Sequence, residues 1–89
     1  MPNRLTADPE AIAISALSFI ASDAERLRIF LDLTGLQPAE IRSAATSPGF
    51  LAAILDHIMS DEALLTAFAS DSNVSPEIIP AARHALGRS

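Results

Sequence analysis

Apolar residues recur along the chain at spacings of three and four, the pattern of one face of an α-helix. Pro residues follow capping residues at several points, as they do at the first position of a helix. Gly and Asn stand where a stripe stops, and both adopt the left-handed conformation that ends helices. Together these signals predict six helices, over residues 9–21, 23–34, 38–46, 48–59, 61–72 and 76–86.

The sequence signals for the predicted helix starts differ in strength. Ser22 with Glu25 has capping-box spacing, and Asp61 places a carboxylate at a helix N-terminus, where the macrodipole favours it. Gln37 is a poor cap, which makes the third start the weakest. The Pro-containing starts are Asp8-Pro9, Gln37-Pro38, Ser47-Pro48 and Ser75-Pro76, and the expected stops are Gly35, Asn73 and Gly87.

The apolar stripes give a candidate core that is shared by all the longer helices. Its members are Ile12, Ala16, Leu17, Phe19, Ile20, Leu27, Phe30, Leu31, Phe50, Leu51, Ile54, Leu55, Ile58, Leu64, Leu65, Phe68, Ile78, Ile79, Ala82 and Leu86.

The first half of the chain aligns with the second half without a gap. In this alignment Ser22-Asp23 falls on Ser60-Asp61, Phe30 on Phe68, and Pro38 on Pro76. Thr34-Gly35-Leu36-Gln37 matches Ser72-Asn73-Val74-Ser75 in role, because each ends a helix, offers an apolar residue and starts the next helix. This correspondence, the repeat alignment, predicts two similar three-helix units, 9–46 and 47–87, packed as one compact bundle.

Composition supports an all-α fold. Hydrophobic residues make up 49% of the 89 residues, Val occurs once, and Tyr and Trp are absent, so strand-forming residues are scarce. The length allows one domain. We therefore expect an N-terminal tail over residues 1–8 and a single helical domain over residues 9–87.

Charge and Cys content narrow the function. The formal net charge is −5, with six Arg and no Lys, so the basic face of a nucleic-acid binder is not expected. The apolar run 11–22 is too short to span a bilayer and lacks the basic flank of a signal peptide. Without Cys there is neither a disulfide framework nor a thiolate metal site, which fits a cytoplasmic protein. Neither nucleic acid nor a membrane is an expected partner.

Three patterns in the sequence bear on chemistry. Residues 33–44 have the form of a helix-turn-helix, but Glu40 and Arg42 give its second helix little with which to bind bases or phosphates. His57 and Asp61 share the i, i+4 spacing of metal ligands but lack a third ligand. No nucleophile, base and orienting acid occur in a catalytic spacing. We expect no catalytic, cofactor-binding or metal-binding residues, no cofactor and no small-molecule substrate.

The second predicted helix is apolar on two sides. Leu27, Phe30 and Leu31 form one stripe, and Ile29 and Leu33 form a second. In one explanation this helix lies at the centre of the domain, with the second unit covering its other face. In the other, Ile14, Ile29 and Leu33, with Arg28 beside them, help to form an exposed partner-binding patch.

The stretches "RLRIFLDLTGLQP" and "SPGFLAAILDHIMSDEALLTAF" resemble a family of short, uncharacterised alphaproteobacterial proteins, catalogued as a domain of unknown function. The similarity runs over residues 10–87 and is clearest where Pro48-Gly49-Phe50 leads into the fourth helix. The resemblance implies a bacterial, cytoplasmic protein and offers no active site to transfer.

These observations favour a small protein–protein interaction or homo-oligomerising module, an adaptor or regulator that binds a protein partner or forms a homodimer. The alternatives are a helix-turn-helix DNA-binding regulator and, after it, a small helical enzyme.

Overall fold

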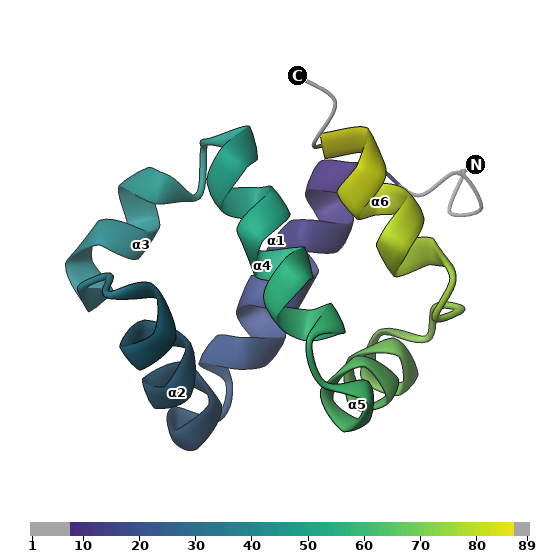
Figure 1. Ribbon diagram of the computed structural model, residues 1–89, viewed down its shortest axis with the longest axis horizontal. Coiled ribbons are helices and arrows are strands. Elements are labelled where there is room, and N and C mark those ends of the chain that lie inside the picture. Colours follow the sequence, from purple (N-terminus) through teal and green to yellow (C-terminus); the bar gives the residue numbers. More distant parts are fainter. Residues whose placement is uncertain (1–7, 87–89) are drawn as a thin grey trace.

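A computed structural model of the protein describes residues 8–86, apart from the side chain of Pro48. Within that range the chain forms α-helices and no strand (Figure 1), so the all-α prediction with six helices is confirmed. The helices are α1 (Pro9–Ala21), α2 (Ala24–Thr34), α3 (Pro38–Ala44), α4 (Pro48–Met59), α5 (Glu62–Ser72) and α6 (Ile78–Leu86).

The helices α1 and α4 cross at the centre of the molecule (Figure 1). α6 packs against both of them, α2 packs against α1, and α5 packs against α4 and touches α1. α3 lies at the edge between α2 and α4 and has no buried residue. The two central helices therefore hold the others together.

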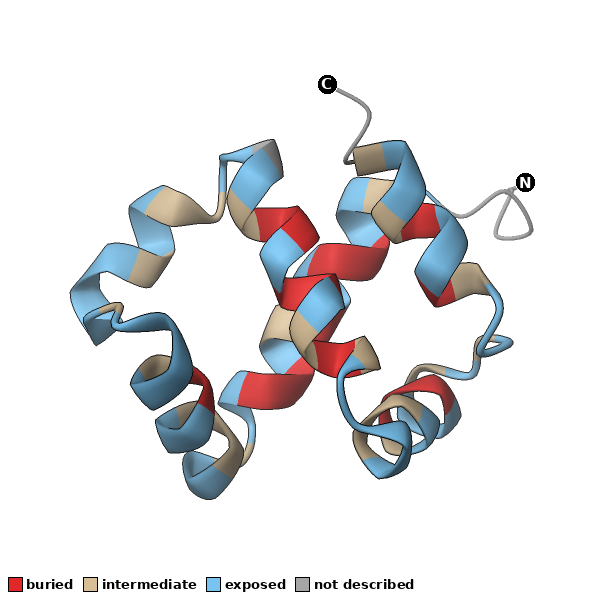
Figure 2. Cartoon of the chain, viewed as in Figure 1, coloured by how far each residue is buried: buried red, intermediate tan, exposed pale blue. Residues whose placement is uncertain are grey.

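The core follows this arrangement, with most buried residues on α1 and α4 where they cross (Figure 2). Phe30 and Phe68 each contribute a fully buried ring, at 0% exposure. Most of the large residues predicted for the core are buried, and the others are partly buried against it. The buried core residues are Ile12, Ala13, Ala16, Phe19, Ile20, Phe30, Leu51, Ile54, Leu55, Ile58, Phe68, Ala69, Ile79 and Ala82.

The helices α2 and α5, which correspond in the repeat alignment, begin and end in the same way. The carboxylates of Asp23 and Asp61 each accept a hydrogen bond from the backbone N–H two residues on, at 2.9 Å. The hydroxyls of Ser22 and Ser60 each donate to the carbonyl three residues back, at 2.7 Å. Gly35 and Asn73 both end their helices in the left-handed region, with φ of 76° and 59°. These two helices therefore share their local capping chemistry.

Three ring contacts join the halves: Phe30 packs against Phe50 with ring centroids 6.1 Å apart, and the repeat alignment relates the other two contacts to each other. Phe19 packs against Phe68, with ring centroids 5.5 Å apart, and His57 packs edge-on against Phe30 at 5.1 Å. The repeat alignment places Phe19 on His57 and Phe30 on Phe68. The pair of His57 and Phe30 is therefore equivalent to the pair of Phe19 and Phe68, with the two halves of the chain exchanged. Each half thus inserts a ring from its first helix against the buried Phe of the other half.

The helix boundaries depart from the prediction at three starts and one end: α2 and α5 begin one residue late, α6 begins two residues late, and α3 ends at Ala44, two residues early. Ser22 is not the N-cap of α2, because its hydroxyl is engaged with the carbonyl of Phe19, and Asp23 caps instead. Pro76 does not start α6. The carbonyls of Ser75 and Pro76 accept hydrogen bonds from the backbone N–H groups three residues on. This tight turn precedes the helix, which begins at Ile78. The predicted stop at Gly87 and the tail over residues 1–7 lie outside the described residues.

The third helices of the two halves differ in packing. Ile79 and Ala82 of α6 are buried against α1 and α4, whereas their counterparts Ile41 and Ala44 of α3 are half-buried. Arg83 of α6 also pairs with an aspartate of α4 at 2.7 Å, and the corresponding positions of the first half hold Ala and Ser. Three residues join α3 to α4. The relation between complete three-helix units stays a prediction.

The buried rings give the first testable prediction. Phe68→Ala should lower the free energy of unfolding by about 3–5 kcal/mol, because it removes a fully buried ring and leaves a cavity between the halves. Phe30→Ala should cost a similar amount. Urea denaturation followed by circular dichroism measures both, with the exposed Ala39→Ser as the control. Losses below about 1 kcal/mol in the two Phe variants would contradict this role.

Candidate functional site

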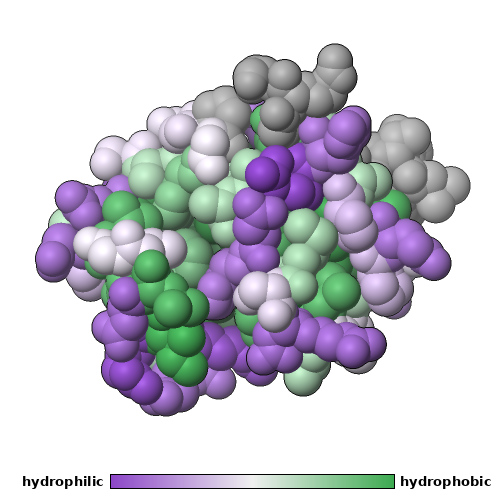
Figure 3. Space-filling model, in the orientation of Figure 1, coloured by the Kyte–Doolittle hydropathy of each residue, from purple (hydrophilic) through white to green (hydrophobic). Residues whose placement is uncertain are grey.

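The candidate partner-binding residues of α2 are exposed. Ile29 is 41% exposed and Leu33 70%, and the two residues are one helical turn apart. Figure 3 shows a strongly hydrophobic patch over the position of α2, bordered by hydrophilic surface. The equivalent positions of α5 hold Ala67 and Asp71, so the patch belongs to one half of the molecule.

The alternative in which the second unit covers this side of α2 is wrong. Phe30 is the buried residue of α2, while Leu27 and Leu31 are packed only partly against the core. α2 packs mainly on α1 and lies at the periphery (Figure 1). The two apolar sides of this helix therefore have different environments, one facing the core and one facing solvent.

Ile29 and Leu33 form one wall of a groove of about 250 Å³. Arg26 continues this wall, and the opposite side comes from the end of α4, the turn to α5 and the start of α5. We call this hollow the α2–α5 groove; it is lined by Arg26, Ile29, Leu33, His57, Ser60, Asp61 and Leu64. The α2–α5 groove thus combines an exposed apolar edge with polar groups from the other half of the chain.

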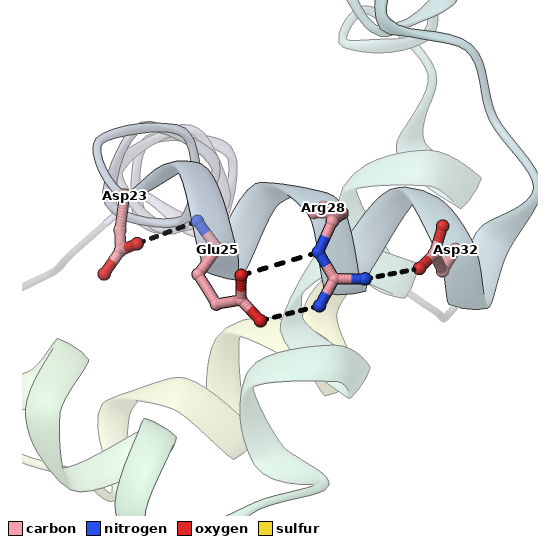
Figure 4. A network of polar contacts seen from close by, with 4 residues as sticks. All are labelled: Asp23, Glu25, Arg28 and Asp32. Carbon is pink, nitrogen blue, oxygen red and sulfur yellow. Dashed lines mark hydrogen bonds and ion pairs between the residues drawn. The ribbon is translucent and has the colours of Figure 1, made fainter.

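The other two predicted partner-binding residues lie apart from the α2–α5 groove. Ile14, on α1, is 48% exposed but is not among the residues that line the groove. Arg28 lies on the outer side of α2, where its guanidinium donates to the carboxylates of Glu25 and Asp32 at 2.6 and 3.1 Å (Figure 4). Its hydrogen-bonding capacity is thus partly used within the helix.

Sequence reasoning missed the polar side of the α2–α5 groove. Arg26 lies with its guanidinium 4.2 Å from the ring centroid of Phe19 and pairs with Asp23 at 3.7 Å, so its charge is held locally. His57 and Asp61 enter from the α4–α5 corner. The repeat alignment contained a signal for this corner, since it paired Ser22-Asp23 with Ser60-Asp61.

A second hollow separates α3 from α1 and α2. It measures about 410 Å³ and has mainly apolar walls, with Arg42 as the charged residue. Its lining residues are Leu17, Ser18, Ala21, Leu27, Pro38, Ile41, Arg42 and Ala45. This hollow is present because α3 does not pack closely on the central helices as α6 does.

Two further findings concern residues 8–86. No group of three or more His, Cys, Asp or Glu side chains in this range is arranged to hold a metal ion. None of the helices there has the length and apolar character needed to cross a membrane. His57 and Asp61 do not share a helix face, since His57 belongs to α4 and Asp61 caps α5, but both line the α2–α5 groove and supply two polar side chains there.

The environment of His57 disfavours its charged form. Partial burial, with Phe30 against the imidazole, lowers the pKa of His57 from its ordinary value of 6.5. The nearby carboxylate of Asp61 partly offsets this effect, since it favours the imidazolium. The neutral ring is therefore the form that fits the contact between the halves.

A pH dependence of stability follows from His57. Between the lowered pKa in the folded state and about 6.5, the unfolded chain binds a proton that the folded protein does not. The stabilisation should be complete above about pH 6.5 and decrease as the pH falls through that value. We expect His57→Phe to flatten the dependence of the unfolding free energy on pH from about 7.5 to 5.5. The exposed His84→Gln serves as the control, and an unchanged slope in His57→Phe would refute the assignment.

Comparisons with known proteins place the chain in a family. Residues 6–89 match the family described as "Protein of unknown function (DUF3572)". No curated protein and no solved structure matches the chain. The family match covers nearly the whole sequence and agrees with the resemblance noted at the α2 and α4–α5 stretches. The chain therefore belongs to the DUF3572 family.

Proposed function

We propose that this protein is a small protein–protein interaction module, an adaptor or regulator, that binds its partner through the exposed apolar residues Ile29 and Leu33 of α2. The observation that carries the proposal is the exposure of Ile29 and Leu33 beside the α2–α5 groove. Exposed contiguous apolar surface with a polar border is typical of interaction sites. The partner is a protein, either another molecule or a second copy of this chain.

The structure of α2 supports a stable binding surface. Phe30 anchors the helix in the core, and Asp23 and Gly35 cap its two ends. The ion pairs that Arg28 forms with two carboxylates add support on the outer side. A helix fixed in this way presents its exposed apolar residues without further ordering, which reduces the entropic cost of association.

The proposal includes a setting in the cell. The resemblance to short alphaproteobacterial proteins and the absence of Cys both support a bacterial protein of the cytoplasm. A binding role without catalysis is part of the same proposal, because no nucleophile, base and orienting acid stand out in the sequence. Nucleic acid, membranes and small-molecule substrates are not among the proposed partners.

Binding to DNA is the alternative function, since α2, the turn at Gly35 and α3 retain the order of a helix-turn-helix. The physical case for it is weak. α3 spans seven residues, the carboxylate of Glu40 is used on the backbone N–H of Gln37 at 2.7 Å, and Arg42 lines a hollow. Few donors therefore remain for phosphates or base edges.

A substitution in the exposed apolar surface of α2 gives a direct test of the proposed function. Ile29→Glu should stay folded, with a change in unfolding free energy within about 1 kcal/mol, because the new carboxylate reaches water. Circular dichroism checks the fold, and light scattering with size-exclusion chromatography measures the mass. If a second copy is the partner, the mass should fall to that of one chain. A variant that unfolds would instead place Ile29 in the core.

Partner capture gives the matching test for another protein. A photo-crosslinking residue placed at Leu33 in the native host should give a covalent adduct that Ile29→Glu abolishes. The same residue placed at Ile14, which is comparably exposed but outside the α2–α5 groove, is the control. Adducts of equal yield from both positions would show nonspecific contact and contradict the proposal.

The DNA alternative has its own expected outcome. Fluorescence anisotropy with nonspecific duplex DNA should show no salt-dependent binding, because the chain has a net charge of −5. Salt-dependent binding that Arg42→Ala reduces would favour the helix-turn-helix function.

A further inference from the structure

We propose that the α2–α5 groove receives an amphipathic helix of a partner protein, with large apolar residues along one stripe and Lys or Arg on both sides of it. This inference rests on the proposed function and specifies the chemistry of the partner. It is drawn from the position of the apolar groove between two acidic surfaces.

The apolar part of the groove fits a helix. Ile29 and Leu33 are four residues apart on α2, about 6 Å along its axis, and Leu64 lies across from them. Side chains at positions i and i+4 of a partner helix have the same separation, so they match this row. Amphipathic helices in apolar grooves use such i, i+3 and i+4 anchors.

Glu25 and Asp32 do not line the groove, but they make the adjoining surface of α2 acidic. Glu25 and Asp32 are four residues before and three residues after Ile29, so both lie beside it on the helix surface. Arg28 pairs with both carboxylates, which leaves one net negative charge among these three residues (Figure 4). The Arg28 guanidinium also lowers the pKa of Glu25, because it hydrogen-bonds to the ionised carboxylate.

The opposite side of the groove is acidic as well. Asp61 lines the groove as the N-cap of α5, and Glu62 follows it in the first turn; both residues are exposed. The positive charge within the groove belongs to Arg26, and Asp23 and the ring of Phe19 hold it in place. A partner that combines apolar anchors with flanking cations complements this pattern of charge.

A second copy of the chain fits the groove less well. Each copy has a formal net charge of −5, and an isologous contact would bring the acidic surfaces of two α2 helices together. Like charges facing each other across an interface oppose association. The charge around the groove therefore favours a basic partner over self-association.

Direct binding to synthetic helices tests the inference. The probe is a fluorescein-labelled peptide of about 16 residues, long enough to form a partial helix in water, with a Leu stripe flanked by Lys. A second peptide has Glu in place of every Lys, and a third keeps Lys but has Ser in place of Leu. We expect the full-length protein to bind the first peptide at least about tenfold more tightly than either of the others at low salt.

Variants of the protein locate the site. Leu33→Ser should weaken binding of the Lys peptide about tenfold, while Ile14→Ser, at an exposed position outside the groove, should leave it unchanged. Asp61→Asn with Glu62→Gln should weaken binding at low salt and have little effect at high salt, where charges are screened. Asn retains the capping function of Asp61. Asp71→Asn, about 15 Å from Asp61 along α5, is the charge control.

The possible outcomes separate this inference from the proposed function. Equal binding of the Lys and Glu peptides, or no effect of Leu33→Ser, overturns the inference. A stable dimer that Ile29→Glu dissociates also overturns it, since a second copy is then the occupant, but the proposed function remains. If no peptide binds, no dimer forms and Leu33 yields no crosslinked protein in the host, both fail.

Discussion

The crossing of α1 and α4 carries the rest of the structure, because α2, α5 and α6 each pack on one or both of these helices. The contact is apolar, and each of the two helices also packs a ring against a helix of the other half: Phe19 of α1 against Phe68 of α5, and His57 of α4 against Phe30 of α2. Each pair joins one half of the chain to the other. Loss of either buried Phe thus removes packing between the halves as well as within one of them.

The surfaces of the two halves differ because their sequences and packing differ. α6 can settle on the central helices, where it buries Ile79 and forms the ion pair between Arg83 and Asp56. α3 is joined to α4 by a short connection and remains at the edge, which leaves the hollow beneath it open. On α2, large apolar residues occupy positions that are Ala67 and Asp71 in α5. The second half therefore contributes mainly to packing, and the first half provides the exposed apolar surface.

The α2–α5 groove joins this surface to the central contact. His57 lines the groove and also packs against Phe30, so one imidazole belongs to the proposed binding site and to the junction between the halves. Its lowered pKa has a structural origin, since a charged ring would be poorly solvated there. Any partner that fills the groove would lie next to the contact on which the fold depends.

Local sequence signals specify the helices and most of the core. Spacing of apolar residues and local capping groups are short-range properties, so α1 and α4 begin and end where they were predicted. The late start of α6 was missed because a turn at Pro76 competes with the helix. Which side of α2 is covered depends on tertiary packing: periodicity shows that both sides are apolar, whereas burial depends on where the second half packs. For the same reason, tertiary packing and not local sequence brings His57 and Asp61 opposite Ile29 and Leu33.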